Sequence, residues 1–294
     1  MRFCFCPSEQ DNKSRAQLAY VSQVSESNGP FVRFMHMHPR TVELILITEG
    51  KGEYFIGDRI YPVRKGDLVI YNSEVVHDEY LESGRPVGTI CCGINNIVCP
   101  GLRENALIPD DTVPVIPLYH HYATIEKLMS SIFNVINQHT VEGPTMAQLL
   151  TRVLLKYVEG NVLMRTGNDI TRRHKNLLDS IKAYIDHNFY EPIRLDALAT
   201  KFNVSPYYVS HEFKRRYGYS PMDYLIKRRL GEAQSLLTTD EGGCEKITSI
   251  AYRVGFSNLS HFQNYFKNKV GKTPGQYRKD YRKANCLFFN INAT

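Results

Sequence analysis

Histidine and carboxylate side chains recur at short intervals in the first third of the chain. Residues 36–50 are HMHPRTVELILITEG, with the pattern H-x-H-x4-E-x6-G, and residues 66–77 are GDLVIYNSEVVH. Imidazole nitrogens and carboxylate oxygens that converge in a fold can bind iron, manganese, zinc or nickel, and they can equally line a pocket for a small polar ligand. The spacing alone does not show convergence, so both kinds of site, and a purely structural role, stay open.

These residues lie in a region whose pattern predicts short strands. Apolar runs and period-two alternation, broken by Gly, Pro, Asp or Asn, predict five strands, at residues 42–48, 52–57, 59–64, 67–72 and 88–94. Short strands at even spacing are typical of an antiparallel barrel or jelly roll. We therefore expect the front of the chain to be a β-barrel.

The two histidine-bearing motifs resemble those of the cupins. The resemblance places the four positions that hold a metal in cupin enzymes on His36, His38, Glu43 and His77, whereas Asn72 and Glu74 stand where the second cupin motif usually has Pro and Gly. Metal binding, the lining of an effector pocket and strand packing all remain open for these side chains. The candidates for contact with an effector are Arg33, His36, His38, Arg40, Glu43, Tyr54 and His77.

A twelve-residue pattern occurs twice in the second half of the chain. Residues 213–224 and 266–277 share F-K-x-x-x-G-x-x-P-x-x-Y, 53 positions apart. Upstream of each copy, apolar residues at i, i+3, i+4 and i+7 predict a short helix, and a second helix follows it. Gly218 and Gly271 are predicted to end these second helices in the left-handed conformation. Each copy is therefore a predicted helix-turn-helix.

The second helix of each copy has a polar outer face. Ser205, followed by Pro206, and Ser257 are the predicted N-caps of these helices. The outward stripes are Tyr207, Ser210, His211 and Lys214 in the first copy and Ser260, Gln263, Asn264 and Lys267 in the second. Residues 222–237 are predicted to form a linking helix about 24 Å long. Such a spacer would place two reading helices in successive major grooves, about 34 Å apart. A repeat that served packing alone would not explain the polar stripes.

The second copy is similar to the DNA-binding domain of the AraC/XylS family of transcription regulators. The residues that carry the resemblance are AYRVGFS (251–257), FQNYFK (262–267) and GKTPGQYR (271–278). The resemblance implies base contacts from Tyr207, Ser210, His211, Ser260, Gln263 and Asn264. The family often has arginine where His211 and Asn264 stand, and Gln263 and Asn264 suit adenine rather than guanine. The expected phosphate partners are Lys214, Arg215, Arg216, Arg228, Arg229, Lys267, Lys269 and Lys272.

Charge divides the chain in the same way as the motifs. Residues 1–171 contain 15 Lys and Arg against 19 Asp and Glu, a balance of −4, whereas residues 172–294 contain 21 against 11, a balance of +10. Only the second half is therefore expected to meet a polyanion. The seven cysteines are odd in number and have no zinc-finger spacing, so reduced thiols are expected. No segment has the length or hydropathy of a signal peptide or membrane span, which predicts a cytoplasmic protein.

The predicted fold class is α+β, with an N-terminal cupin-like barrel, a helical hairpin and a C-terminal all-α domain with two helix-turn-helix motifs. The expected domains are an effector-binding and dimerisation domain at 1–165, a linker at 166–174, the DNA-binding domain at 175–284 and a tail at 285–294. Full apolar stripes predict helices within 121–138 and 144–164. By resemblance to the family, these two helices are expected to pair across a homodimer.

The favoured function is a sequence-specific transcription regulator, an activator by family resemblance, that binds double-stranded promoter DNA and contacts RNA polymerase. Its effector is expected to be a small molecule, with a sugar as the leading candidate, and neither catalysis nor a cofactor is required. One alternative is a metal-dependent cupin enzyme, or a metal sensor, fused to a DNA-binding tail. Another is a DNA-binding protein without sequence preference, which the mixed polar stripes disfavour.

Overall fold

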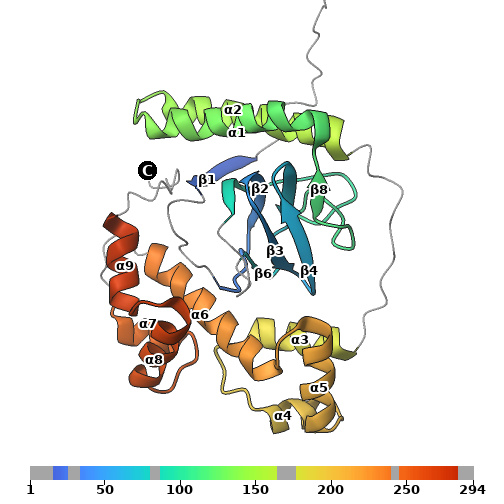
Figure 1. Cartoon of the computed structure of the whole chain (residues 1–294), viewed down its shortest axis with the longest axis vertical. Helices are drawn as coiled ribbons and strands as arrows, with labels where there is room; N and C mark the ends of the chain where they lie inside the picture. The colour runs from blue at the N-terminus through green and yellow to red at the C-terminus, as the bar shows by residue number, and fades with distance from the viewer. Residues whose placement is uncertain (1–15, 26–33, 80–86, 164–176, 240–244, 284–294) are drawn as a thin grey trace, which may run out of the picture.

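The computed structural model describes residues 16–25, 34–79, 87–163, 177–239 and 245–283 (Figure 1). The predicted linker at 166–174, the tail at 285–294 and Arg33 lie outside these ranges. The described chain is a sheet domain followed by a helical domain, which confirms the predicted α+β class. The strands are β1 Gln17–Val24, β2 Thr41–Glu49, β3 Lys51–Ile56, β4 Arg59–Arg64, β5 Asp67–Tyr71, β6 His77–Asp78, β7 Gly88–Asn95 and β8 Val115–Pro117.

The strands form two antiparallel sheets that enclose an interior. One sheet has the order β1-β7-β2-β5-β8 and the other β4-β3-β6. Successive side chains of a strand point to opposite faces, so along β2 the residues Ile45 and Ile47 join the cluster between the sheets, whereas Leu44 and Leu46 face away from it. Glu43 shares the inward phase of Ile45. The carboxylate of Glu43 must therefore find its hydrogen-bond or ionic partners inside the sheet domain.

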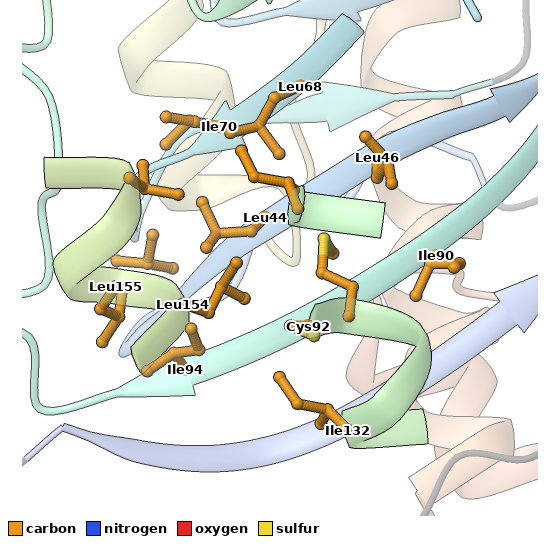
Figure 2. Packing of buried hydrophobic residues seen from close by; sticks show 14 of the residues in the cluster. Leu44, Leu46, Leu68, Ile70, Ile90, Cys92, Ile94, Ile132, Leu154 and Leu155 are labelled. Carbon is orange, nitrogen blue, oxygen red and sulfur yellow. The ribbon is translucent and has the colours of Figure 1, made fainter. Parts of the chain in front are cut away.

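Two helices cover the outer face of the five-stranded sheet. They are α1 Tyr122–Asn137 and α2 Gly143–Tyr157, and a π-helical turn, Val158–Val162, follows α2. Figure 2 shows Ile132, Leu154 and Leu155 of these elements packed against Leu44 and Cys92 of the sheet. The apolar face of α1 thus packs on the sheet within the chain, and the expected pairing of the two helices across a homodimer stays a prediction. On α2, Met146, Leu149 and Val153 remain 47%, 56% and 53% exposed.

The helical domain contains both predicted helix-turn-helix motifs. Its elements are α3 Leu177–Asn188, α4 Leu195–Lys201, α5 Pro206–Tyr217, α6 Pro221–Thr239, α7 Ile247–Arg253, α8 Leu259–Val270 and α9 Pro274–Lys283. Gly218 and Gly271 close α5 and α8 with φ of 79° and 81°, as the sequence predicts. Ser205 caps α5 by accepting from the Tyr208 amide. The cap of α8 is Asn258 rather than the predicted Ser257, because the Asn258 side chain accepts from the His261 amide.

The helical domain docks on the sheet domain through α5 and α6. Met35, Phe55 and Val76 of the sheet domain lie in one buried cluster with Phe213 and Tyr224 of the helical domain. In Figure 1, α6 lies beside β6 and joins the two helix-turn-helix motifs. None of the helices in the described ranges is long and apolar enough to span a bilayer.

Candidate functional site

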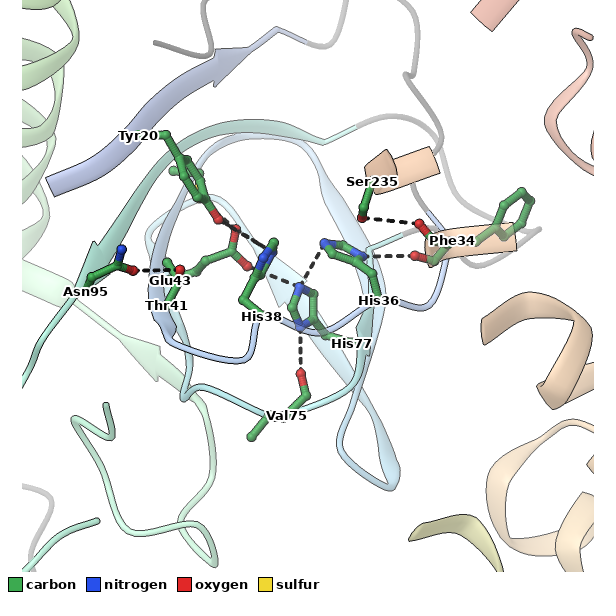
Figure 3. A network of polar contacts seen from close by, with 12 residues as sticks. Tyr20, Phe34, His36, His38, Thr41, Glu43, Val75, His77, Asn95 and Ser235 are labelled. Carbon is green, nitrogen blue, oxygen red and sulfur yellow. Dashed lines mark hydrogen bonds and ion pairs between the residues drawn. The ribbon is translucent and has the colours of Figure 1, made fainter. Parts of the chain in front are cut away.

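The four side chains that the cupin resemblance groups together, His36, His38, Glu43 and His77, meet inside the sheet domain (Figure 3). His36 and His77 form an isolated antiparallel bridge, and Glu43 projects from β2 toward both. His77 Nε2 lies 3.1 Å from His36 Nε2 and 3.1 Å from Glu43 Oε2, and His38 Nε2 lies 3.5 Å from Glu43 Oε1. One nitrogen or oxygen atom of each residue lies within 4.8 Å of the corresponding atom of the others. Short-range pattern had suggested these residues, and strand pairing brings them together.

The backbone orients two of the imidazoles. His36 Nδ1 is 2.9 Å from the Phe34 carbonyl, and His77 Nδ1 is 2.9 Å from the Val75 carbonyl. A carbonyl oxygen can only accept, so each Nδ1 carries the hydrogen and each Nε2 points into the cluster. The Tyr71 ring stacks on His77 with centroids 3.9 Å apart. The imidazole rings of His36 and His77 are thus each fixed in tautomer and in orientation.

Tyr20 and Cys91 complete the surroundings of Glu43 and were not predicted. The Tyr20 hydroxyl donates a short hydrogen bond to Glu43 Oε1, and the Cys91 thiol lies 3.6 Å from the same oxygen. Burial raises the pKa of the Cys91 thiol well above its usual value, so the sulfur keeps its proton. Burial also opposes ionisation of Glu43, but the charge of His38 and the contact with His77 together lower its pKa well below the usual value. The centre of the domain therefore holds a carboxylate.

The remaining predicted effector contacts are not gathered in this cluster. Tyr54 is buried among Ile45, Ile47 and Tyr71 in the apolar interior. Burial raises the pKa of its hydroxyl well above the usual value. Arg40 is exposed. The structure therefore brings together His36, His38, Glu43 and His77 and leaves Arg40 and Tyr54 apart from them.

The predicted base-contacting residues lie on the outer faces of α5 and α8. Tyr207 is 76% exposed and stacks on His211, with ring centroids 5.7 Å apart. Ser210 is half-buried, whereas His211, Ser260, Gln263 and Asn264 are exposed. The opposite faces carry Val209, Phe213, Phe262 and Phe266, all fully buried. Both helices thus present to solvent the polar stripe that the sequence predicts.

The predicted phosphate partners divide into exposed and buried groups. Lys214, Arg215, Lys267, Lys269 and Lys272 are exposed. Arg216 pairs with Asp179 at 2.7 Å and Asp58 at 3.6 Å. Arg228 is 0% exposed, and Arg229 is buried with donors 2.6 Å from the carbonyls of Phe189 and Glu191. The expectation that Arg228 and Arg229 contact phosphate is therefore corrected, because both side chains are buried inside the protein.

A three-residue strap, Phe34–His36, joins the histidine cluster to α6. The Phe34 amide donates to Gln234 Oε1 at 2.8 Å, and Arg228 Nη1 donates to the Met35 carbonyl at 3.1 Å. Gly231 allows this approach, since a Cβ there would lie 2.0 Å from the Met35 oxygen. The carbonyl of Phe34 holds His36. One short segment therefore contacts both the cluster and the helix that links the two helix-turn-helix motifs.

Comparisons with known proteins match both halves of the chain. Residues 26–153 match the AraC-like ligand binding domain, and residues 198–280 match a helix-turn-helix domain. The Escherichia coli protein named uncharacterized HTH-type transcriptional regulator YdiP is 28% identical over 255 residues, covering 86% of this chain and 82% of that protein. The HTH-type transcriptional activator RhaS of Shigella dysenteriae is 24% identical over 276 residues, covering 88% and 92%.

A solved structure, the C-terminal domain of the two-component response regulator yesN from Fusobacterium nucleatum, is 33% identical, covers 35% of this chain and 99% of that domain, and has a TM-score of 0.33. The relatives are named as transcription regulators and not as enzymes, which is the class that the sequence predicts. With a ligand-binding domain in front and two helix-turn-helix motifs behind, the chain belongs to the AraC family of transcriptional regulators.

Proposed function

We propose that the chain reads promoter DNA by placing α5 and α8 in successive major grooves of one duplex. The observation that carries the proposal is the exposure of both polar stripes on helices joined by the single helix α6. The 19 residues of α6 span about 28 Å, a length suited to helices that enter grooves about 34 Å apart. Gln263 and Asn264 are the side chains suited to adenine.

Exposed cations beside the reading faces support the same docking. Lys214 and Arg215 extend from the end of α5, and Lys267 and Lys269 lie at the matching end of α8, with Lys272 just after it and paired with Asp280 at 2.7 Å. Phosphate contacts of this kind hold register without reading sequence and make affinity fall with salt. The cations at the ends of α5 and α8 would each contact DNA phosphates beside one major groove.

The sheet domain is proposed to control DNA binding through the strap. A ligand that favours one state of the cluster favours one placement of Phe34–His36 and hence of α6, which is a population shift. The expected ligand is a small molecule, for which the sequence alone suggests a sugar. Activation through contact with RNA polymerase, and a cytoplasmic location, belong to the same proposal.

We also propose a homodimer formed through α2. Met146, Leu149 and Val153 form an exposed apolar stripe at helical spacing, and Leu150 beside it is half-buried. The stripe lies on the exposed side of α2, where it could pack against the same stripe of a second copy of the chain. The domain division at residues 165 and 175 remains a prediction that limited proteolysis can test.

The test compares the protein's own upstream DNA with a scrambled duplex at one salt concentration. The wild type should bind its own sequence at least tenfold more tightly. Asn264→Ala should lose most of that preference and little of the binding to scrambled DNA, because one bidentate base contact discriminates by about 1–3 kcal/mol. Asn134→Ala, the same change on an exposed position of α1, is the control. Equal binding to both duplexes by the wild type would contradict the proposal.

A further inference from the structure

The two facing nitrogens of His36 and His77 are both acceptors when the rings are neutral. Each ring uses its Nδ1 hydrogen toward a backbone carbonyl at 2.9 Å, so the Nε2 atoms meet as lone pairs at 3.1 Å. Two lone pairs at this separation repel unless a positive centre lies near both. The contact therefore calls for a cation.

A buried carboxylate oxygen faces the same point. Glu43 is 2% exposed, and its Oε2 has no hydrogen-bond partner among the described residues, although His77 Nε2 is 3.1 Å away. An unsatisfied buried carboxylate oxygen is costly. A hydrogen on His77 Nε2 could make a well-aligned hydrogen bond to either Glu43 Oε2 or His36 Nε2, but not to both. A metal ion could be coordinated by His36 Nε2, His77 Nε2 and Glu43 Oε2 together.

The spacing and the donor set select the class of ligand. Ligand bonds to zinc-like ions are about 2.0–2.2 Å long, so donors on opposite sides lie about 4 Å apart. The four donor atoms lie within 4.8 Å of one another, with two pairs at 3.1 Å, so only small shifts are needed. A sugar would have to force apart groups already in contact. Three imidazoles and one carboxylate suit first-row transition ions, whereas Mg²⁺ and Ca²⁺ prefer oxygen ligands.

We propose that His36, His38, Glu43 and His77 bind one divalent first-row transition ion per chain, and that this ion is the ligand acting on α6 through the strap. The carbonyls of Phe34 and Val75 orient two of the imidazoles from outside, and Tyr20 holds the other carboxylate oxygen. The inference rests on the proposed function only in naming the ligand of the sheet domain. Metal binding itself can be tested without DNA.

The first experiment measures bound metal in the full chain, produced without a histidine tag and stripped with a chelator. Incubation with Zn²⁺, Ni²⁺, Mn²⁺ or Mg²⁺, removal of unbound ion and elemental analysis should give one transition ion per chain and no Mg²⁺. Bound ion should also raise the thermal midpoint. His38→Ala and Glu43→Gln should each lower the bound ion at least tenfold, while His120→Ala, which removes an exposed imidazole elsewhere, should retain one per chain.

His38 and Glu43 are the chosen positions because His38 is the least buried member and glutamine preserves the shape of Glu43. Far-ultraviolet circular dichroism checks that both variants are folded. One ion per chain in either folded variant, or no transition ion in the wild type, would overturn the metal site. Specific DNA binding by a wild-type protein that binds no metal would leave the proposed function intact, so the two failures are distinguishable.

The second experiment measures DNA affinity with and without the ion. The wild type should change its affinity for its own upstream DNA at least fivefold on metal loading. Gln234→Ala should still bind one ion, but its affinity should change less than twofold, because the strap has lost its hydrogen bond to α6. Equal affinity of the loaded and stripped wild type would overturn the role of the ion as the controlling ligand.

Discussion

The two helix-turn-helix copies share their local structure and differ in what surrounds them. Phe213 and Phe266 are fully buried at matching positions, and a left-handed glycine ends each reading helix. The first copy shares its apolar cluster with Met35, Phe55 and Val76 of the sheet domain. Of the described sheet-domain residues, only Phe34 belongs to the cluster of the second copy.

The repeated pattern specifies the local structure of each helix-turn-helix but not its contacts with the sheet domain. Caps and turns depend on nearby residues, so both copies fold alike. Contact with the sheet domain depends on where each copy lies, and within the described ranges α5 pairs with that domain through Arg216 and Asp58. A change in the sheet domain can therefore reach α5 directly, whereas the described route to α8 runs through the strap and α6.

The largest expected effect comes from removing the matching phenylalanines. Phe213→Ala and Phe266→Ala should each lower the free energy of unfolding by about 3–5 kcal/mol. Phe213 contacts Tyr224, with ring centroids 5.6 Å apart, and Tyr224 contacts Phe55 of β3 at 6.2 Å. Hydrogen exchange in β3 should therefore rise in the Phe213 variant and stay unchanged in the Phe266 variant.

Phe→Leu at the same two positions is the control, because it keeps most of the volume and should produce the same pattern at smaller size. Equal exchange in β3 for both alanine variants would show that the two copies are coupled equally to the sheet domain. The comparison drawn from the clusters would then be wrong.

The next effect tests the strap. Gly231→Ala would place a Cβ 2.0 Å from the Met35 carbonyl oxygen and should destabilise the protein by about 1–3 kcal/mol. Alanine in a helix is ordinarily about 1 kcal/mol better than glycine, so the expected sign is opposite to the usual one. Gly275→Ala, with no atom within 4 Å of its added Cβ, is the matched control. Chemical denaturation measures both, and a Gly231 variant as stable as the control would contradict the close docking.

Local pattern predicted five strands because each alternates or runs apolar over at least five residues, and β2, β3, β4, β5 and β7 confirm them. The unpredicted strands lack that signal. A bulge between Leu18 and Tyr20 breaks the alternation of β1, and β6 and β8 have two and three residues. Overlooking β1 also hid Tyr20, which contacts Glu43.

The sites follow the same rule. The reading faces follow helical spacing, so the exposure of five of the six candidates could be predicted from sequence, whereas Ser210 is half-buried. Arg228 and Arg229 were expected to face DNA because they are basic, but docking of α6 on residues nearly 200 positions earlier buries Arg228. No local pattern encodes such a contact. The convergence of His77 with His36 likewise depends on a pairing across 41 positions.

A smaller effect should be equal in the two copies. Lys214→Ala and Lys267→Ala remove exposed cations at matching ends of α5 and α8. If each contacts one phosphate, each should lower the slope of log affinity against log salt by about 0.9. Affinity titrations at four salt concentrations, on specific and scrambled DNA, measure this. A change in sequence preference with either variant would mean that the lysine reads a base instead.

The smallest effect concerns the caps, where the copies use different residues, Ser205 and Asn258, at matching positions 53 apart. Ser205→Ala and Asn258→Ala should each cost about 1 kcal/mol, because each removes the acceptor of an amide at the start of a reading helix. Ser257→Ala should cost nearly nothing, since Asn258 occupies the cap. Thermal unfolding of the three variants measures the order. Should Ser257→Ala be the costly change in the second copy, the cap would lie where the sequence first indicated, and the start of α8 would move by one residue together with its reading face.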